Sequence, residues 1–300
     1  MKRFLKWVGI VIASLLVIAL LAALLLYAAG TARLNKTYEI AIADIPVPTD
    51  SVVVDRGRHL VEAVMLCLAC HTETLAGDVL LEAPGIAAVY ASNLTSGRGG
   101  IGSAYTDTDY VRAIRHGVNR DGRALMIMHS DAYNALSRED LGAIIAYLRS
   151  VPPVDNPLPA TVTKPLGRIF VALGMFDMEA MPLIPAEMID HEASFREAYT
   201  PDTTAEYGEY LSTIALCGMC HGRDFTGAPP IEEGGVPGPD IAVYGAGRGY
   251  SDQEFFATLR TGVTPYGRSL DPESMPWEVY GRMTDDELRA IRKYLGSRPP

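Results

Sequence analysis

Every cysteine of the chain lies in one of two five-residue segments with the pattern Cys-x-x-Cys-His. Two thiols at this spacing can each form a thioether bond with one edge of a single porphyrin. The adjacent histidine is then held beneath the iron as its proximal ligand. The sequence therefore predicts two sites for covalent haem c, made by Cys67, Cys70, His71, Cys217, Cys220 and His221.

Two other kinds of site also contain Cys-x-x-Cys, namely redox dithiols and halves of zinc sites. A redox dithiol does not explain the histidine that follows both copies. A zinc site that used both pairs would need them together, yet about a domain's length of chain separates them. Because no cysteine is left for a disulfide or a catalytic nucleophile, covalent haem is the favoured interpretation.

The closing parts of the two halves match at a constant offset of 147 residues, as between Tyr133 and Tyr280. Met128 and Met275 share this offset, and each lies five residues before its tyrosine. A thioether sulfur opposite the proximal histidine raises the haem potential and closes the iron to other ligands. We therefore expect Met128 and Met275 to be the distal iron ligands.

The second of these ligands is the better defined, since Met275 is followed by Pro276. In the first half, Met126 and His129 lie close to Met128, and the choice among the three stays open. Core packing is the usual role of a single methionine. His116 is expected to be structural, because its repeat partner is a threonine.

Helices are expected to position both motifs, because apolar residues recur at helical spacing on either side of each one. Ser137 with Asp140, and Thr284 with Glu287, stand in the positions of N-terminal capping boxes. Glycine- and proline-rich chain follows each histidine and suits a loop around a planar cofactor. The backbone carbonyl of Pro84 is a candidate acceptor for the Nδ1–H group of His71, and a plain turn proline is the alternative. The expected helices cover residues 55–68, 107–115 and from 137 onward, then 207–216, 251–260 and from 284 onward.

The N-terminus begins with Lys2, Arg3 and Lys6, followed by an uncharged apolar run at 7–29. A membrane-spanning helix needs ~20 such residues, more than the apolar core of a signal peptide. The basic flank places the N-terminus in the cytoplasm and the rest of the chain outside. A cleaved signal peptide ending at Ala28-Ala29-Gly30 is the alternative, which the length of the run disfavours.

We expect an all-α chain with two tandem haem domains. The proline-rich segment between the domains is predicted to be a strap that crosses their junction, and a surface for a partner subunit is the second choice. A short apolar helix is expected in it over 166–176, and it contains three methionines, Met175, Met178 and Met181. Packing is a commoner use of such methionines than a copper site or an electron relay. The predicted boundaries are anchor 1–30, tether 31–50, domain one 51–155, strap 156–200 and domain two 201–300.

The net charge and the absence of several motifs disfavour some kinds of partner and enzyme. The net charge of −10 does not suggest a nucleic-acid partner. Three of the 26 basic residues precede the apolar run, so 23 basic residues face 36 acidic ones in the exported part, a net charge near −13. Such a surface would steer a partner with a basic docking patch. The chain contains no dinucleotide-binding G-x-G-x-x-G unit, P-loop or Ser/His/Asp set.

The order of these features resembles a class I cytochrome c domain: Cys-x-x-Cys-His, a Gly/Pro loop, a helix, G-V-x-x-x-G-R, methionine and a capped closing helix. The pair resembles the membrane-anchored cytochrome c subunits of alcohol, aldehyde and gluconate-type dehydrogenases. It is also similar in layout to the dihaem subunit of cbb3-type oxidases. The dehydrogenase subunits usually carry three haem domains and this chain carries two. In the first domain, His129 stands where proline usually follows the distal methionine.

The resemblance implies an electron-transfer protein rather than an enzyme, at the outer, periplasmic face of the cytoplasmic membrane. It would relay single electrons from a quinol- or substrate-oxidising dehydrogenase to a terminal acceptor or oxidase. Its expected partners are membrane lipid and redox proteins, meaning dehydrogenase or oxidase subunits or a soluble cytochrome. The alternatives are a subunit of a cbb3-like oxidase and a dihaem peroxidase, which needs one iron without a firm sixth ligand.

Overall fold

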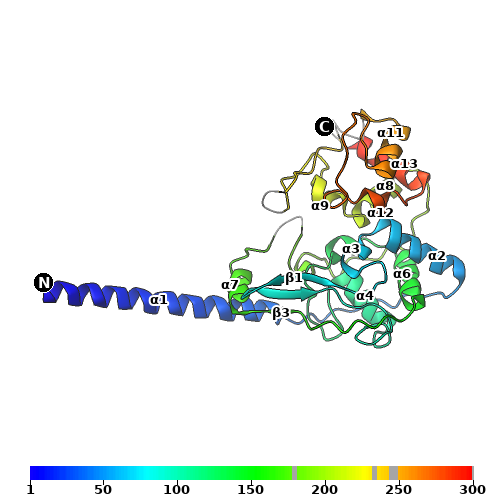
Figure 1. Cartoon of the computed structure of the whole chain (residues 1–300). Coiled ribbons are helices and arrows are strands. Elements are labelled where there is room, and N and C mark those ends of the chain that lie inside the picture. Colours follow the sequence, from blue (N-terminus) through cyan, green and yellow to red (C-terminus); the bar gives the residue numbers. More distant parts are fainter. Residues whose placement is uncertain (178–180, 232–234, 243–248, 299–300) are drawn as a thin grey trace.

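The computed structural model describes residues 1–177, 181–231, 235–242 and 249–298. The protein is mostly helical, as predicted: a long N-terminal helix leads into two helical units (Figure 1). The first unit contains α2 (Ser51–His59), the π-helical η1 (Leu60–Val64), α3 (Cys67–His71), α4 (Asp107–His116), α5 (Ser130–Tyr133) and α6 (Arg138–Ser150). The second unit contains α8 (Ala205–Ile214), α9 (Cys217–His221), α11 (Asp252–Thr261), α12 (Trp277–Tyr280) and α13 (Asp285–Ser297).

Each unit is built on a close crossing between its first and last long helices, α2 with α6 and α8 with α13. A Cβ atom on Gly57 would lie 1.9 Å from the carbonyl oxygen of Ala143, and one on Gly208 would lie 2.0 Å from that of Ala290. Only glycine permits this approach. Since Ala143 and Ala290 differ by the repeat offset, both units use the same crossing.

The helix that precedes the first motif differs from the prediction. It begins at Ser51, capped by Asp50, changes to π-helical hydrogen bonding at Leu60, and is broken at Met65, where the backbone is extended. The expected helix running straight into Cys67 is therefore wrong. The π turn takes up one extra residue, because ten positions separate Gly57 from Cys67 whereas nine separate the equivalent residues of the second unit.

A small antiparallel sheet interrupts the expected loop after His71. Its strands are β1 (Val79–Ala83), β2 (Ala87–Tyr90) and β3 (Val162–Thr163), in the order β1-β2-β3. The turn between β1 and β2 contains Gly85, whose φ of +78° is accessible to glycine at little cost. The glycine and proline content of this stretch predicts an irregular loop, because these residues are typical of loops as well as of hairpin turns.

The N-terminal helix α1 (Lys2–Leu34) continues four residues beyond the predicted anchor. It is long and apolar enough to cross a membrane. The predicted tether lies along the first unit after α1 ends. Within it, the backbone N–H of Tyr38 donates to the carbonyl of Gly122 at 2.8 Å, and Arg138 donates to the carbonyl of Asp44 at 2.8 Å. This segment therefore holds α1 close to the first unit.

The segment between the units has two parts. Its first part contains α7 (Pro165–Ala172), which packs against α1, followed by the short 3-10 helix η2 (Pro185–Glu187). In its second part, Phe195 lies 3.7 Å from the guanidinium carbon of Arg115 in the first unit. Tyr199 then stacks on Tyr210 of the second unit at 3.9 Å.

Only the second part, which contains Phe195 and Tyr199, therefore crosses between the units as the predicted strap would.

Among the three methionines of the segment, Met175 is exposed and Met181 lines an apolar cavity, whereas Met178 lies outside the described residues. The domain boundaries given above stay a prediction.

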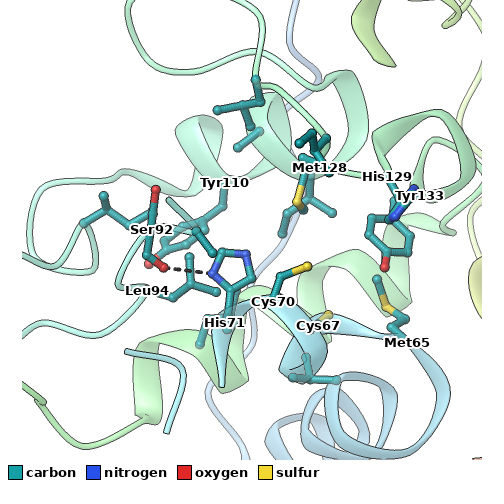
Figure 2. Close-up of a pocket in the computed structure, with 18 of the residues that line it drawn as sticks. Met65, Cys67, Cys70, His71, Ser92, Leu94, Tyr110, Met128, His129 and Tyr133 are labelled. Atoms are coloured by element: carbon teal, nitrogen blue, oxygen red, sulfur yellow. Dashed lines mark hydrogen bonds between the residues drawn. The ribbon is translucent and has the colours of Figure 1, made fainter. Parts of the chain in front are cut away.

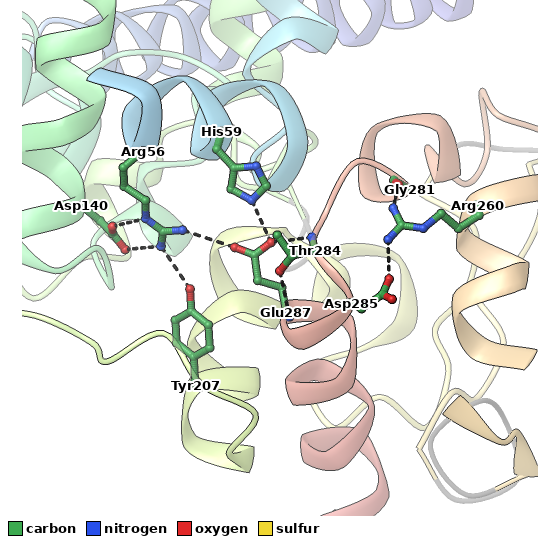
Figure 3. A network of polar contacts seen from close by, with 9 residues as sticks. All are labelled: Arg56, His59, Asp140, Tyr207, Arg260, Gly281, Thr284, Asp285 and Glu287. Atoms are coloured by element: carbon green, nitrogen blue, oxygen red, sulfur yellow. Dashed lines mark hydrogen bonds and ion pairs between the residues drawn. The ribbon is translucent and has the colours of Figure 1, made fainter. Parts of the chain in front are cut away.

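A cluster of charged and phenolic side chains joins the two units (Figure 3). The guanidinium of Arg56 donates to both carboxylate oxygens of Asp140, at 2.9 and 3.1 Å, and to Glu287 of the second unit at 3.3 Å. It also donates to the hydroxyl of Tyr207 at 3.1 Å. The Nε2–H group of His59 donates to Glu287 at 2.8 Å. One cation therefore joins a carboxylate from each unit.

The cluster has an approximate two-fold relation. Asp140 and Glu287 are repeat equivalents, each three residues after its helix N-cap, and each accepts a hydrogen bond from the other unit. His59 donates to Glu287, and its counterpart Tyr210 donates to Asp140 at 2.6 Å.

The structure also corrects one of the two predicted capping boxes. Ser137 accepts from the backbone of Asp140, but the Asp140 carboxylate is bonded to Arg56 and Tyr210 and does not return to Ser137.

We expect Glu287→Gln to weaken the joint between the units. Glutamine can keep the hydrogen bond from the backbone N–H of Thr284, now 2.9 Å long, so the change removes the charge and spares the helix cap. The Glu287 side chain is only 6% exposed, and a hydrogen bond to a charged group such as Arg56 contributes about 1.5–3 kcal/mol. Urea unfolding followed by far-UV circular dichroism should show a lower midpoint.

Asp286→Asn is the matched control for this change. Asp286 pairs with Arg289 on the exposed side of the same helix, and such pairs contribute about 0.3–0.5 kcal/mol. Equal midpoints for the two variants would show that the Glu287 charge does not join the units.

Candidate cofactor sites

The first site is a cavity between α3 and the chain that follows α4 (Figure 2). Helix α3 presents Cys67, Cys70 and His71 on one wall, and Met128 lies on the other with its sulfur directed into the space between them. The open space measures about 1080 Å³, part of it continuous with solvent. The remaining wall is largely aliphatic and aromatic, and includes Val61, Leu94, Ile101, Tyr105, Tyr110, Ile114, Tyr133 and Leu148.

The imidazole of His71 is fixed by a backbone carbonyl. Its Nδ1 lies 2.8 Å from the carbonyl oxygen of Ser92, and because a carbonyl only accepts, Nδ1 carries the proton. Nε2 is then left with a free lone pair. Burial lowers the pKa of His71, which keeps the ring neutral. The expected acceptor, Pro84, is wrong: it lies in the hairpin turn, and the chain returns to His71 only after β2.

The second site repeats this arrangement. Nδ1 of His221 lies 2.8 Å from the carbonyl oxygen of Pro239, and burial again lowers the histidine pKa. In both units the histidine carbonyl accepts a backbone hydrogen bond six residues later, from Gly77 at 3.0 Å and from Gly227 at 2.9 Å. In the sequence, the residue whose carbonyl accepts from the histidine lies 21 positions after His71 but only 18 positions after His221. In the first unit, the β1–β2 hairpin lies between the histidine and this residue.

The thiols lie in an environment that disfavours the thiolate. Burial raises the pKa of Cys67 to about 12, with a smaller contribution from Cys70, and the pKa of Cys217 to about 12 in the same way. Burial also raises the pKa values of Cys70 and Cys220. A redox dithiol needs a lowered thiol pKa to react. The geometry therefore does not favour the dithiol interpretation at either motif.

The three candidates for the first distal ligand all line the first cavity but differ in their other contacts. Ile127, between the two methionines, has a φ of +65°, which is rare for a β-branched residue and turns the chain there. Met126 accepts a 3.9 Å hydrogen bond from Thr163 and also lines a second, apolar cavity. His129 lies to the side of Met128, toward Tyr133 (Figure 2). Figure 2 shows the Met128 sulfur directed into the space near His71.

In the second unit, Met275 is half-buried and packs against the core. Its backbone N–H donates to the carbonyl of Asp271 at 2.9 Å, and Pro276 then caps α12. Met128 and Met275 therefore occupy equivalent places, each just before the short helix that ends in the repeat tyrosine.

His116 contacts another histidine. Its Nδ1 lies 3.1 Å from Nδ1 of His191, and burial together with the His191 charge lowers its pKa to about 4. A neutral, buried ring of this kind agrees with the structural role expected for His116.

Sequence reasoning missed the two carbonyl acceptors and the charged cluster at the joint. The carbonyls of Ser92 and Pro239 belong to no residue-type pattern, because any residue can supply a backbone oxygen. Asp140 and Glu287 did stand at equivalent repeat positions. Their acidic character was fully explained by helix capping, so nothing in the sequence indicated that they would meet partners across the joint.

Comparison with known proteins supplies the family. The family described as "Cytochrome c" matches residues 54–152 and 205–299. The "Fructose dehydrogenase cytochrome subunit" of Gluconobacter japonicus is 33% identical over 267 residues, covering 82% of this chain and 52% of the relative. The "Alcohol dehydrogenase (quinone), cytochrome c subunit" of Gluconacetobacter polyoxogenes is 30% identical over 295 residues, covering 87% of this chain and 58% of the relative.

A third relative, the "Gluconate 2-dehydrogenase cytochrome c subunit" of Pantoea cypripedii, is 30% identical over 187 residues, covering 57% of this chain and 38% of the relative. The chain thus spans a little over half the length of the first two relatives and less of the third.

Proposed function

Because the chain belongs to the cytochrome c family, whose members bind haem c covalently, we propose that it carries two haems and transfers single electrons between them. The observation that most supports this is the repetition of one arrangement. In each unit a Cys-x-x-Cys-His helix meets a core built on the same glycine crossing, and a backbone carbonyl orients its histidine. The protein is an electron-transfer protein rather than an enzyme.

The residues of each site fit a covalently attached haem. The two cysteines would supply the thioether bonds, and the neutral imidazole would offer Nε2 to the iron, because Nδ1–H is held by a carbonyl. The apolar wall of the first cavity would exclude water from the porphyrin faces. When bound, the group supplies reversible one-electron exchange between ferrous and ferric iron. We assign Met128 and Met275 as distal ligands, on their equivalent places and the direction of the Met128 sulfur.

The packing of the two units supports transfer between the sites. Helix α12, which follows Met275, contacts η1, which leads to the cysteines of the first unit. Helix α5, which follows Met128, contacts α8, which leads to the cysteines of the second unit. Each site therefore adjoins the joint through two elements, so a short path between the haems is expected.

The location and partners are proposed on coarser grounds. Helix α1 would span the cytoplasmic membrane, with the basic residues before it on the inner side and the haem units at the outer, periplasmic face. The relatives are named as subunits of dehydrogenases, so we infer that a dehydrogenase donates electrons to this chain. The acceptor would be a terminal oxidase or another membrane or soluble carrier.

Three measurements on detergent-extracted full-length protein test this proposal. A pyridine haemochrome assay should find two covalent haems per polypeptide, and mild extraction should co-purify a dehydrogenase subunit. Both ferric haems should be low spin and should resist cyanide, because each iron would have a firm sixth ligand. One haem or none would contradict the dihaem assignment, and an open ferric site would support a peroxidase instead.

A further inference from the structure

Helix α7 exposes apolar side chains on one face. Leu166, Phe170 and Leu173 follow one another at helical spacing, and Met175 lies just beyond the end of the helix. Leu166 is 44% exposed, Leu173 54% and Met175 59%, while the ring of Phe170 contacts Phe176. We call these four residues the α7 face. A row of large apolar side chains in water is costly, so such a face usually marks a contact surface.

The opposite sides of α7 are closed by the protein. Gly167 is buried, and a Cβ there would lie 2.2 Å from the carbonyl oxygen of Ile86 at the tip of the hairpin. Val171 is also buried, in the apolar cavity beside the first site. The α7 face is therefore the side that this unit leaves uncovered among the described residues.

Helix α7 contacts the C-terminal end of α1 closely, over residues 30–33. A Cβ on Gly30 would lie 1.8 Å from the carbonyl oxygen of Arg168, and the Arg168 side chain donates to Thr31 at 3.2 Å. From α1, Arg33 donates to the carbonyl of Val171 at 3.0 Å. Figure 1 shows α7 lying across α1 at this point. Any motion of α1 along its axis would carry α7 with it.

The level of this contact coincides with the end of the apolar run of α1. The run ends at Ala29, one residue before Gly30. Its 23 residues extend about 34 Å at ~1.5 Å per residue, close to the ~30 Å hydrocarbon thickness of a bilayer. If α1 spans the membrane, α7 therefore lies at the outer boundary between acyl chains and headgroups.

The charges around α7 suit this boundary. Its polar side carries Arg168, and Lys164 precedes its first turn. Arg33 pairs with both Asp177 and Glu187, at 2.7 and 2.6 Å, which offsets the charge of two nearby carboxylates. Interfacial helices combine an apolar face with basic residues in this way, since the basic groups attract anionic headgroups.

We propose that the α7 face inserts into the outer leaflet of the bilayer that α1 spans, with lipid as its occupant. The inference rests on the membrane anchoring proposed above. Lipid is favoured over a protein partner because α7 packs against α1 where its apolar run ends, which places the face at the level of the outer bilayer boundary. Together α1 and α7 would fix the height and tilt of the first haem site over the membrane.

Photolabelling of the full-length protein in nanodiscs tests this. The discs would contain phosphatidylcholine and phosphatidylglycerol with a small share of phosphatidylcholine carrying a diazirine on its acyl chain. After illumination, mass spectrometry would map lipid adducts. We expect adducts on α1 and on residues 165–177, the latter roughly tenfold above the exposed second-unit peptide 263–270, as for a helix buried ~5–10 Å in the boundary.

Leu166→Gln combined with Leu173→Gln should lower α7 labelling several-fold and leave α1 labelling unchanged. Val236→Gln, an exposed apolar position of the second unit, is the matched control and should change neither. Labelled α1 with unlabelled wild-type α7 would overturn the proposal and direct attention to a protein partner or solvent. Unlabelled α1 would overturn the membrane anchor itself, so the two failures can be told apart.

Discussion

We expect Cys67→Ser combined with Cys70→Ser to remove one covalent haem and to leave the other in place. The reason is that each unit has its own attachment helix, its own carbonyl-held histidine and its own crossing of long helices. The second site takes no attachment residue from the first unit. A haemochrome assay should therefore fall from two haems per chain to one, with the remaining haem still low spin.

The mirror change, Cys217→Ser with Cys220→Ser, is the matched control and should leave the first haem. The two variants need not be equally stable, because the units share the buried Arg56 cluster and loss of one core weakens its neighbour. If either change abolished both haems, the units would not be independent folding units, and the predicted boundaries at 51–155 and 201–300 would lose their meaning.

The repeat explains why so much of the fold could be predicted. Once the repeat is recognised, each helix in one unit predicts its counterpart in the other, and two weak patterns support each other. Helix α4 was expected at 107–115 and runs from Asp107 to His116, and α11 was expected at 251–260 and runs from Asp252 to Thr261. Both begin at a serine or threonine cap, a local signal that the sequence displays directly.

The features that were missed depend on contacts between distant parts of the chain. The hairpin β1–β2 is completed by β3, more than 70 residues later, where Ala87 pairs with Thr163. The pair of Arg56 with Glu287 joins residues 231 positions apart. Neither leaves a periodic pattern in the sequence. The Gly/Pro content that did mark the hairpin is equally typical of a loop, so composition could not separate the two.

In the candidate sites too, features set by local sequence could be predicted, whereas features set by distant contacts could not. Cysteine and histidine spacing is local, so five consecutive positions are enough to predict attachment residues, and these stay a proposal. The acceptor for His71 could not, because its identity depends on where the chain returns after the hairpin. Pro84 and Ser92 are eight residues apart in sequence, and only the fold decides between them.

Met275→Ala should open the second haem iron and lower its potential. Met275 is half-buried against the core, and its thioether is the group we assign opposite His221. Without that sulfur, water can reach the iron, so the ferric haem should become partly high spin and bind cyanide. Axial ligands set haem potentials over a range of about 0.8 V, and we expect this one to fall on the order of 0.1 V. The sulfur-to-iron charge-transfer band should lose the contribution of one haem.

Met283→Leu provides the control for this change. Met283 is almost fully buried eight residues later in the same unit, so its replacement perturbs packing without removing the proposed ligand. It should leave the charge-transfer band and both potentials in place. If Met275→Ala and Met283→Leu gave the same spectrum as the wild-type protein, a different residue would hold the distal position of the second haem. The assignment of Met128 as the distal ligand of the first haem would then also be weakened, because it rests partly on the equivalence of Met128 and Met275.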